Sequence, residues 1–469
     1  MKILLIRNND LGFFNQTNIT GVYPPLGLAY IASVLRKAGY QVNLLDNQIL
    51  GFRNNSLKNE IKRIAPDVVL LSAMSPSWSE LIKLSKLIKD VSPQIITGVG
   101  GPHLTVYPIE SLSHKSFDFG VYGEGENTIL EVVKTIEEGR TLEGIKGCIF
   151  RENGEVIVNA PREEIDDLDS IPFPSIGLLP YKKYIALSVN SPFFTIVTSR
   201  GCPYNCKFCF QGYLGRYRTR SPENIVNEME MLVNEYGIQE IIVFDETFAV
   251  EEQGVLKTCE LIQKKGIKFK WDIRTRVDLL NEKVLKSLKN TGCYRIHLGI
   301  ESGNQEILNM MNKKISIPEI VEKVNLAKKF GFEIRGYFML AYPTETYRTI
   351  CKTIDFAKSL SLHWASFTVT MGLPETDIYR EALRRGYFDI DYWREHAKGN
   401  ILNSKPYFIP NGLEEDDLFA LKKKAYLEFY LRPKIIWSIL TSARPMEVIK
   451  NLRLLLRLSP SIFYSIIKI

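Results

Sequence analysis

Apolar and amphipathic segments alternate along the first 140 residues. The short apolar segments are rich in Leu, Ile and Val, which favours strands, whereas the longer segments repeat apolar positions at helical spacing. The predicted strands are Lys2–Arg7, Gln41–Asp46, Asp67–Ala73, Gln94–Val99 and Phe117–Tyr122. The predicted helices are Leu26–Ala38, Ser56–Ile64, Ser79–Val91 and Asn127–Glu138. Such alternation predicts an α/β domain of the doubly wound, Rossmann-like kind, with a parallel sheet between two layers of helices.

A second alternating series runs from Phe194 to Leu383. Its predicted strands are Thr195–Ser199, Glu240–Phe244, Lys268–Ile273, Tyr294–Ile300, Glu333–Leu340 and Ala365–Thr370. Helices such as Pro222–Tyr236 and Ile317–Phe330 fit between them. Six β/α units predict a partial or full TIM-type barrel, in which the chemistry is expected at the C-terminal ends of the strands.

The two series are joined by a segment with weaker patterning. Asn153-Gly154 separates two short apolar runs and predicts a hairpin. The stretch 165–174 is acidic and contains prolines, so regular structure is not expected there. The predicted division is therefore a Rossmann-like domain at 1–140, a connector at 141–190, a barrel at 191–385 and a helical C-terminal region at 386–469.

Composition and charge change this picture only near the C-terminus. The 469 residues are 45% hydrophobic and carry a formal net charge of +7. No apolar run reaches the ~18 residues that a transmembrane helix needs. Residues 431–469 contain seven basic side chains and one acid, a net +6, which leaves +1 for the rest of the chain. The overall charge therefore does not indicate nucleic-acid binding.

The basic tail has an amphipathic pattern between Met446 and Ser459. Its apolar residues at helical spacing are Val448, Ile449, Leu452, Leu455 and Leu456, and Lys450, Arg453 and Arg457 fall on another face. A helix of this kind can lie on an anionic membrane surface. The alternative is an ordinary helix that packs against the barrel.

Glycines follow two of the predicted N-terminal strands. The fourth strand ends in the run Gly98–His103 and the fifth in Gly123–Glu126, whereas the first strand is followed by Asn8-Asn9-Asp10 without a G-x-G-x-x-G motif. The pattern argues against a nicotinamide or flavin dinucleotide, because the pyrophosphate needs those glycines at the first turn. A ligand at the carboxyl edge of the sheet is expected, although glycines can also serve only as turn residues.

Cys202, Cys206 and Cys209 form a C-x3-C-x2-C run after the first predicted barrel strand. A [4Fe–4S] cluster normally takes four cysteines, so three local thiolates would leave one iron open to another molecule. Open coordination positions are typical of catalytic metals. Zinc is the alternative, but no fourth Cys or His lies close in sequence. The other four cysteines are scattered, and a long chain without a signal peptide is not expected to use disulfides.

This run resembles the radical S-adenosylmethionine (SAM) superfamily. The resemblance implies that the three cysteines bind three irons and that the amino and carboxylate groups of SAM chelate the fourth. By the same resemblance the expected SAM contacts are Phe208, Asp245, Glu246, Glu301, Ser302 and Arg335, of which Asp245-Glu246 and Glu301-Ser302 also follow predicted strands. The alternatives are a solvated strand end for Asp245-Glu246 and a helix N-cap for Ser302.

The N-terminal domain resembles the cobalamin-binding domain that often precedes this barrel. The matching runs are Tyr23–Tyr30, Gly100–His103 and Gly123–Glu126. The resemblance implies that cobalamin is contacted by Ser72, Ser75, Gly100, Gly101, His103, Gly123, Glu124 and Gly125. His103 could instead complete a loop. Because no Asp-x-His-x-x-Gly occurs, the lower ligand of the cobalt is expected to differ from the usual histidine or to be absent.

The resemblance implies an oxygen-sensitive cytoplasmic enzyme that cleaves SAM reductively at a [4Fe–4S] cluster and activates a C–H bond. Methyl transfer to an unactivated carbon is the favoured outcome, with ring formation or oxidation of a lipid or tetrapyrrole-like substrate as the alternative. A non-catalytic cobalamin or cluster sensor is the alternative from a different class. Expected partners are a small-molecule or lipid substrate and a flavodoxin- or ferredoxin-type electron donor, with possible peripheral membrane contact through 431–469.

Overall fold

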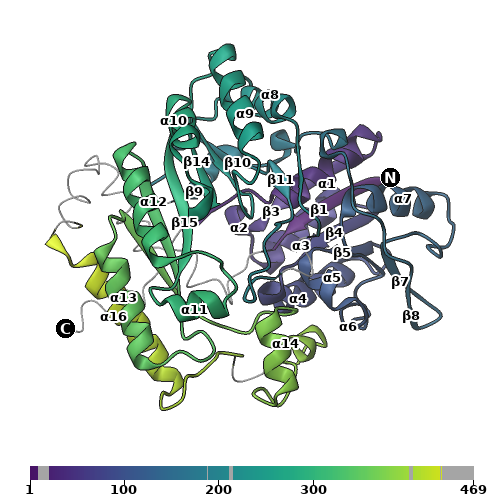
Figure 1. Cartoon of the computed structure of the whole chain (residues 1–469). Coiled ribbons are helices and arrows are strands. Elements are labelled where there is room, and N and C mark those ends of the chain that lie inside the picture. The colour runs from purple at the N-terminus through teal and green to yellow at the C-terminus, as the bar shows by residue number, and fades with distance from the viewer. Residues whose placement is uncertain (9–20, 187, 211–214, 401–404, 434, 436–469) are drawn as a thin grey trace. The chain divides into compact units, whose positions relative to one another are not determined.

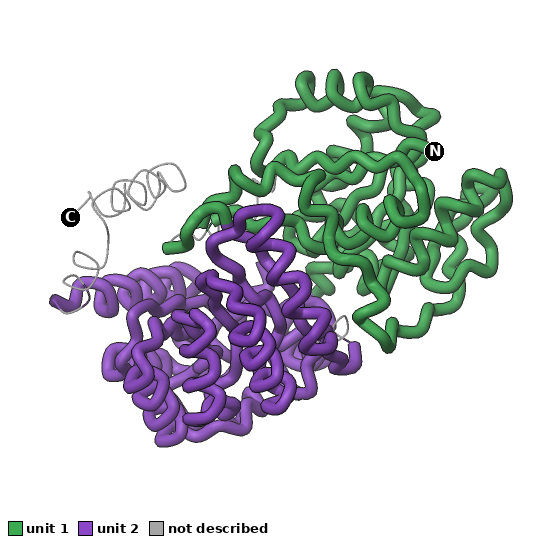
Figure 2. Tube along the Cα trace, turned by 90° about the horizontal axis from the view of Figure 1, so that it is seen from above, with its two compact units in different colours: residues 1–192, 390–403, 453–469 green, residues 193–389, 404–452 purple. Residues whose placement is uncertain are grey.

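The computed structural model describes residues 1–8, 21–186, 188–210, 215–400, 405–433 and 435. Within these residues the chain forms two compact units, green and purple in Figure 2. The first comprises 1–192 and 390–403, and the second comprises 193–389 and the described part of 404–452. The amphipathic segment predicted between Met446 and Ser459 lies outside the described residues. None of the described helices is long and apolar enough to cross a membrane.

The first unit is built on a seven-stranded sheet with the order β3-β1-β4-β5-β6-β7-β8 (Figure 1). The strands are β1 (Lys2–Arg7), β3 (Gln41–Asp46), β4 (Val68–Ser72), β5 (Ile96–Gly100), β6 (Phe119–Val121), β7 (Cys148–Glu152) and β8 (Glu155–Val158). The helices are α1 (Leu26–Lys37), α2 (Asn47–Leu50), α3 (Asn54–Ile64), α4 (Trp78–Val91), α5 (Pro102–Val106), α6 (Pro108–Leu112) and α7 (Gly125–Glu137). The first five strands of this order are parallel. The predicted doubly wound fold is confirmed.

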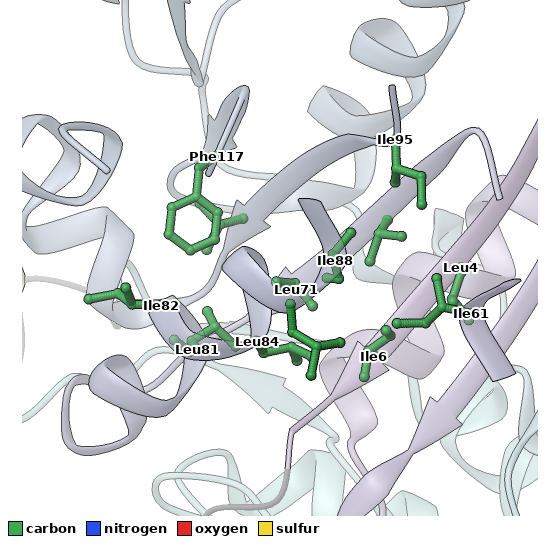
Figure 3. Packing of buried hydrophobic residues seen from close by; sticks show 14 of the residues in the cluster. Leu4, Ile6, Ile61, Leu71, Leu81, Ile82, Leu84, Ile88, Ile95 and Phe117 are labelled. Carbon is green, nitrogen blue, oxygen red and sulfur yellow. The ribbon is translucent and has the colours of Figure 1, made fainter. Parts of the chain in front are cut away.

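Both faces of this sheet are covered, which explains why its strands read as continuous apolar runs. Helices α1 and α7 pack against each other, as do α3 and α4. Leu4 and Ile6 of β1 join the core that includes Ile61 of α3 and Leu81 of α4 (Figure 3). The alternate residues of β1 are also fully buried. The sheet is therefore buried on both sides, and only its edges are open to a ligand.

The predicted connector belongs to the first unit. Strands β7 and β8 extend the sheet as an antiparallel hairpin whose turn residues, Asn153 and Gly154, have φ of 51° and 88° as a type I′ turn requires. The short pair β2 (Gly21–Val22) and β9 (Ile185–Ala186) ties the end of the connector to the start of the chain. The compact unit therefore extends past the boundary predicted near residue 140, because sequence cannot show that a later hairpin pairs with β6.

The predicted C-terminal region is also divided between the units. Helix α15 (Tyr392–Ala397) belongs to the first unit and packs against α4 and α6. The indole Nε1 of Trp78 donates a hydrogen bond of 2.9 Å to the carbonyl of Ala397. Helix α16 (Glu415–Tyr430) belongs to the second unit. The region predicted at 386–469 is helical where the structure describes it, but it is shared between the two units, since these two helices bury their apolar faces against different cores.

The second unit contains a six-stranded parallel sheet in the order β10-β13-β14-β15-β16-β17. Its strands are β10 (Phe193–Ile196), β13 (Glu240–Val243), β14 (Lys270–Arg276), β15 (Cys293–Glu301), β16 (Glu333–Leu340) and β17 (Trp364–Val369). The helices are α8 (Pro222–Asn234), α9 (Glu252–Lys265), α10 (Glu282–Asn290), α11 (Gln305–Met310), α12 (Ile317–Lys329), α13 (Tyr347–Ser359) and α14 (Asp377–Arg384). Because β10 and β17 are not paired, the barrel is partial, as expected.

Helix α16 covers the open edge of the barrel sheet. The Tyr430 hydroxyl donates to the carbonyl of Ala365 at 2.8 Å and accepts from its N–H at 3.2 Å. The Tyr426 hydroxyl accepts from the N–H of Phe367 at 3.3 Å. An uncovered edge strand can pair with another chain. The two tyrosine hydroxyls instead bond backbone groups of β17 that a seventh strand would otherwise pair with.

Replacing Tyr430 by Phe is expected to lower the free energy of unfolding of the second unit by about 1–2 kcal/mol, because two backbone groups of Ala365 lose their partner. Urea denaturation of the variant would measure this loss. Tyr347→Phe is the matched control, because Tyr347 is 53% exposed on α13 and should change stability by less than about 0.5 kcal/mol. Equal losses in the two variants would contradict the role assigned to Tyr430.

Candidate active site

The three cysteines lie on a loop that follows the first strands of the barrel. Strand β11 (Ser199–Arg200) pairs with β12 (Arg218–Thr219), and the loop begins directly after it. Gly201 has φ of 80°, and a Cβ there would lie 2.4 Å from the carbonyl oxygen of Arg216. The backbone N–H of Lys207 donates to the carbonyl of Met311 at 3.0 Å. The loop is therefore held at both its start and its middle.

The chemistry around the thiols fits an iron–sulfur cluster. All three cysteines are free. Burial raises the pKa of Cys206, and raises that of Cys209 to about 12, so both need a metal to become thiolates. No three His, Cys, Asp or Glu side chains in the described part of the chain converge closely enough to hold one metal ion. Cysteines that each bind a different iron of a cluster need not converge on one point.

Two side chains that the sequence did not single out lie next to these thiols. The Thr247 Oγ1 lies 3.5 Å from the Cys202 Sγ, and the Arg276 Nη1 lies 3.7 Å from the Cys206 Sγ. Arg276 also donates to the carbonyl of Lys313 at 2.5 Å. Arg276 ends strand β14 and Thr247 follows β13 closely. Their position after predicted strands was the signal that could have identified them.

Asp245, an expected SAM contact, is hydrogen-bonded to the residues that lead into the cysteine loop. Its Oδ1 accepts from the N–H groups of Thr198 and Ser199 at 2.6 and 3.3 Å, and its Oδ2 accepts from both of their hydroxyls. The residue is 3% exposed. Burial raises the pKa of this carboxyl while these hydrogen bonds lower it. Asp245 therefore orders the start of the cysteine loop, and its neighbour Glu246 is exposed and free to meet a ligand.

Glu301 lies at the end of β15 beside Lys313. The Lys313 Nζ donates to Glu301 Oε1 at 2.9 Å and lies 5.8 Å from the centre of the Phe208 ring. A Cβ at Gly299 would come within 2.5 Å of that carboxylate oxygen. Glu301 itself has φ of 68°, a strained value for a residue with a side chain. Gly299 therefore leaves room for the buried Glu301–Lys313 pair, which lies next to Phe208 of the cysteine loop.

Two other residues expected to contact SAM, Ser302 and Arg335, have hydrogen-bond partners within the protein. Ser302 is fully buried, lies 3.1 Å from the Thr353 hydroxyl and accepts from the N–H of Asn304. Arg335 lies five residues before the end of β16, about 16 Å along the strand, and donates to Glu333 at 3.0 Å. Both side chains therefore have partners within the protein, and their contact with SAM stays a prediction. Sequence placed these residues on the correct elements but could not show the direction or depth of their side chains.

Five of the eight expected cobalamin contacts gather at the carboxyl edge of the first unit's sheet. Ser72 ends β4 opposite Gly100, which ends β5 opposite Val121 of β6. Gly101 has φ of 97°, and a Cβ there would lie 2.7 Å from the Ser72 hydroxyl. Gly123 and Gly125 follow β6. This edge is built of backbone and small side chains, which fits the close approach of a large ring.

The other three residues expected to contact cobalamin have partners within the protein; they are Ser75, His103 and Glu124. His103 is fully buried, and its Nδ1 lies 3.0 Å from the Ser75 hydroxyl, which is also buried. The Glu124 carboxylate accepts from the N–H of Ile165 at 2.6 Å. The contact with Ser75 is what the loop alternative for His103 predicts, and a corrin contact of His103 stays a prediction. Met74, which sequence reasoning missed, is 51% exposed beside Ser72 and offers an apolar surface to a ring.

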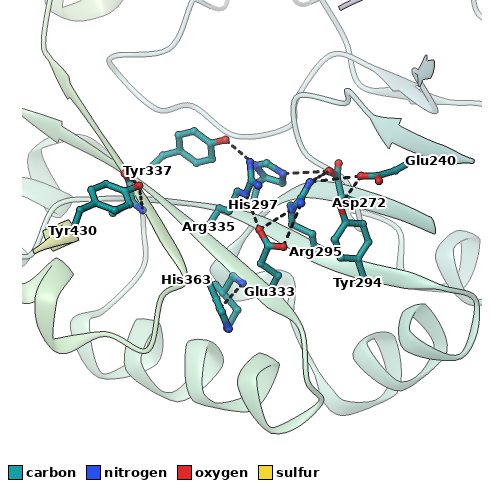
Figure 4. A network of polar contacts seen from close by, with 12 residues as sticks. Glu240, Asp272, Tyr294, Arg295, His297, Glu333, Arg335, Tyr337, His363 and Tyr430 are labelled. Atoms are coloured by element: carbon teal, nitrogen blue, oxygen red, sulfur yellow. Dashed lines mark hydrogen bonds and ion pairs between the residues drawn. The ribbon is translucent and has the colours of Figure 1, made fainter. Parts of the chain in front are cut away.

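Buried charges line the inner face of the barrel sheet (Figure 4). Arg295 of β15 contacts Asp272 of β14 at 3.2 Å and Glu333 of β16 at 2.9 Å. His297, two residues further along β15, lies 3.5 Å from Asp272 and 2.7 Å from the hydroxyl of Tyr337. Burial lowers the pKa of His297 to about 4 against the opposing effect of Asp272. The imidazole is therefore neutral at neutral pH.

The folded protein is expected to lose stability as the pH falls from about 6.5 to 4. The unfolded chain binds a proton at His297 near pH 6.5, whereas the folded chain does so only near pH 4. The cost is absent above pH 6.5 and reaches about 3 kcal/mol near pH 4. Denaturant unfolding at pH 7.5 and pH 5 would measure it. His297→Gln should show a smaller difference between the two pH values, and an unchanged difference would contradict this assignment.

Comparisons with known proteins match both units. A family model for the B12 binding domain matches residues 15–133, and a model for the Radical SAM superfamily matches residues 196–357. An uncharacterized methyltransferase of Pyrococcus horikoshii is 34% identical over 440 residues, which is 93% of this chain and 94% of that protein. The anaerobic magnesium-protoporphyrin IX monomethyl ester cyclase of Rubrivivax gelatinosus is 30% identical, over 92% of this chain and 78% of the cyclase.

A solved structure has the same fold across both units. The radical SAM methyltransferase TsrM from Kitasatospora setae, solved with cobalamin and a [4Fe–4S] cluster, superimposes with a TM-score of 0.73 at 16% identity. The match covers 92% of this chain and 90% of that one. At this identity the likeness concerns the fold alone.

Proposed function

This chain belongs to the radical SAM enzymes that carry a B12-binding domain, and from that premise we propose that it transfers a methyl group to an unactivated carbon. The loop of Cys202, Cys206 and Cys209 carries the proposal, because three free thiols at the C-terminal ends of the barrel strands leave one iron of a cluster open. The relative named as a methyltransferase, which aligns along nearly the whole of both chains, supports the outcome.

When bound, the cluster and cobalamin supply the electron and the methyl carrier that this reaction requires. Cys202, Cys206 and Cys209 would hold the cluster. Arg276 and Thr247 stand against two of the sulfurs, where a guanidinium stabilises negative charge and a hydroxyl donates a hydrogen bond.

We propose that the residues beside the cluster loop bind SAM. Glu246 is exposed three residues after β13 and would accept a hydrogen bond from an amino group. The Glu301–Lys313 pair offers both signs of charge beside Phe208, whose ring would pack against the adenine. Ser72, Gly100, Gly101, Gly123 and Gly125 would line the cobalamin site.

The test begins with full-length protein purified anaerobically from cells supplied with cobalamin. Its visible spectrum should contain both corrin bands and the broad absorption of an iron–sulfur cluster. Reduction with SAM should release 5′-deoxyadenosine, and SAM with a deuterated methyl group should pass that group to a product. Absence of corrin bands would contradict the proposed methyl transfer, whereas the proposed cleavage of SAM at the cluster would still stand.

Ring formation or oxidation is the second candidate, supported by the cyclase relative. The two candidates differ in one measurable product, because a cyclase would form 5′-deoxyadenosine and a changed substrate without a methylated product. A sensor would not cleave SAM at all. We also propose that a flavodoxin- or ferredoxin-type protein supplies the electron, which replacing dithionite by such a protein in the same assay would test.

A further inference from the structure

A chain of three polar groups crosses the inner face of the barrel sheet (Figure 4). The Asp272 Oδ2 lies 3.5 Å from the His297 Nε2, and the His297 Nδ1 lies 2.7 Å from the Tyr337 hydroxyl. The residues come from the adjacent strands β14, β15 and β16. Carboxylate, imidazole and hydroxyl therefore stand in line, in the order that serves proton transfer in many enzymes.

The direction of the hydrogen bonds follows from the protonation states. Burial raises the pKa of Asp272, but His297 and the nearby arginines outweigh this effect and hold the pKa at about 2. The 3.5 Å contact between Asp272 Oδ2 and His297 Nε2 does not have hydrogen-bond geometry. The negative carboxylate beside Nε2 nevertheless favours the neutral tautomer that carries its proton on Nε2. The lone pair on Nδ1 then accepts from the Tyr337 hydroxyl. The phenol is thus arranged to pass its proton to the imidazole.

Only one end of this chain of groups is open. Asp272 is 1% exposed and His297 5%, whereas Tyr337 is 38% exposed. Thr368 on the neighbouring strand β17 is also exposed. The interiors of most such barrels are filled with layers of apolar side chains. Here the exposed part of the inner face is polar, and no step assigned so far to the cluster loop uses it.

A hydrocarbon group in this place would bury the Thr368 hydroxyl without a partner, at a cost of about 1–3 kcal/mol. It would also leave the Tyr337 oxygen, whose proton is already bonded to His297, without a donor. Tyr337 and Thr368 would instead be satisfied by a group that donates and accepts hydrogen bonds. Arg335, held by Glu333 beside the ring of Trp364 at 5.1 Å, adds positive charge to the same face. The chemistry of this surface therefore selects a polar group of a substrate.

We infer that Tyr337, supported by His297 and Asp272, exchanges a proton with the substrate, which presents a hydroxyl or amine group to the barrel interior. In this step the X–H proton of the substrate moves to the Tyr337 oxygen while the Tyr337 hydroxyl proton moves to His297 Nδ1. No electrons are exchanged, and Asp272 balances the charge of the imidazolium. The inference rests on the proposed function for the presence of a substrate there.

The hydrogen-bond directions are tested without any substrate. Nitrogen-15 NMR of the histidine-labelled full-length protein, with His297 assigned by comparison with His297→Gln, should show Nε2 protonated and Nδ1 as an acceptor. Tyr337→Phe should shift the Nδ1 signal toward that of a free imidazole nitrogen, whereas Tyr294→Phe, which removes a hydroxyl bonded to Glu240 in the same network, should not. A proton on Nδ1, or no shift in Tyr337→Phe, would overturn the inference.

The substrate class is tested with radiolabelled methyl-SAM and a metabolite extract of the source organism. Label should appear in water-soluble product, and Tyr337→Phe should lower its formation at least about 100-fold while release of 5′-deoxyadenosine continues. Label confined to apolar lipid, or full activity of Tyr337→Phe, would overturn the inference. If 5′-deoxyadenosine forms without any labelled product, the proposed methyl transfer fails, and the NMR experiment still decides the role of Tyr337.

Discussion

Asp245→Ala is expected to lower the free energy of unfolding of the second unit by about 3–5 kcal/mol and to reduce its iron content sharply. The substitution leaves two backbone N–H groups and two hydroxyls of Thr198 and Ser199 buried without an acceptor. Those two residues lead directly into the cysteine loop, so its first ligand, Cys202, would lose its position. Denaturant unfolding and iron analysis of protein purified without oxygen would measure both effects.

Asp245→Asn is the matched control. An amide oxygen can keep both backbone hydrogen bonds at Oδ1, and the hydroxyls that face Oδ2 can rotate to accept from the amide nitrogen. We expect a loss of about 1 kcal/mol and nearly complete iron loading. If Asp245→Ala instead folds and loads iron normally but binds SAM weakly, the carboxylate is a ligand contact, and the structural role assigned to it is wrong.

Cys209→Ser is expected to remove the visible absorption of the cluster and to lower reductive cleavage of SAM at least about 100-fold, because even the loss of an outer partner of a metal ligand costs 10–100-fold. Loss of a thiolate leaves two of three cluster ligands. The fold should be retained, since Cys209 is only partly buried on a loop. Absorption spectra, iron and sulfide analysis and the yield of 5′-deoxyadenosine would give the result.

Cys351→Ser controls for the general effect of removing a thiol. Cys351 is also free and partly buried, but it lies on the barrel helix α13. Its variant should keep the spectrum and the activity. Loss of the cluster in both variants, or in neither, would show that the local run of three cysteines does not define the site.

Both units were predictable because their patterns are local. Strands β1, β3 and β16 have the predicted bounds, since each is a short run of strand-forming residues between clear turn signals. The Asn153-Gly154 turn was equally plain. The partners of β7 and α15 could not be predicted. The sequence of a hairpin or an amphipathic helix shows that it must pack on another surface, but not which surface that is.

Sequence alone determined which residues are proposed as cluster ligands, because three cysteines within eight residues reach one another whatever the rest of the chain does. It also placed Ser72, Gly100, Gly101, Gly123 and Gly125 together, since the ends of parallel strands share an edge.

Only the tertiary structure decided which polar side chains at those edges remain available. Asp245, Ser302 and His103 follow strands as the expected contacts should, yet neighbours distant in sequence satisfy or enclose each of them. Arg276, Lys313 and the line from Asp272 to Tyr337 arise because parallel strands set residues far apart in the chain side by side. The direction and depth of a side chain depend on that packing, which no local pattern records.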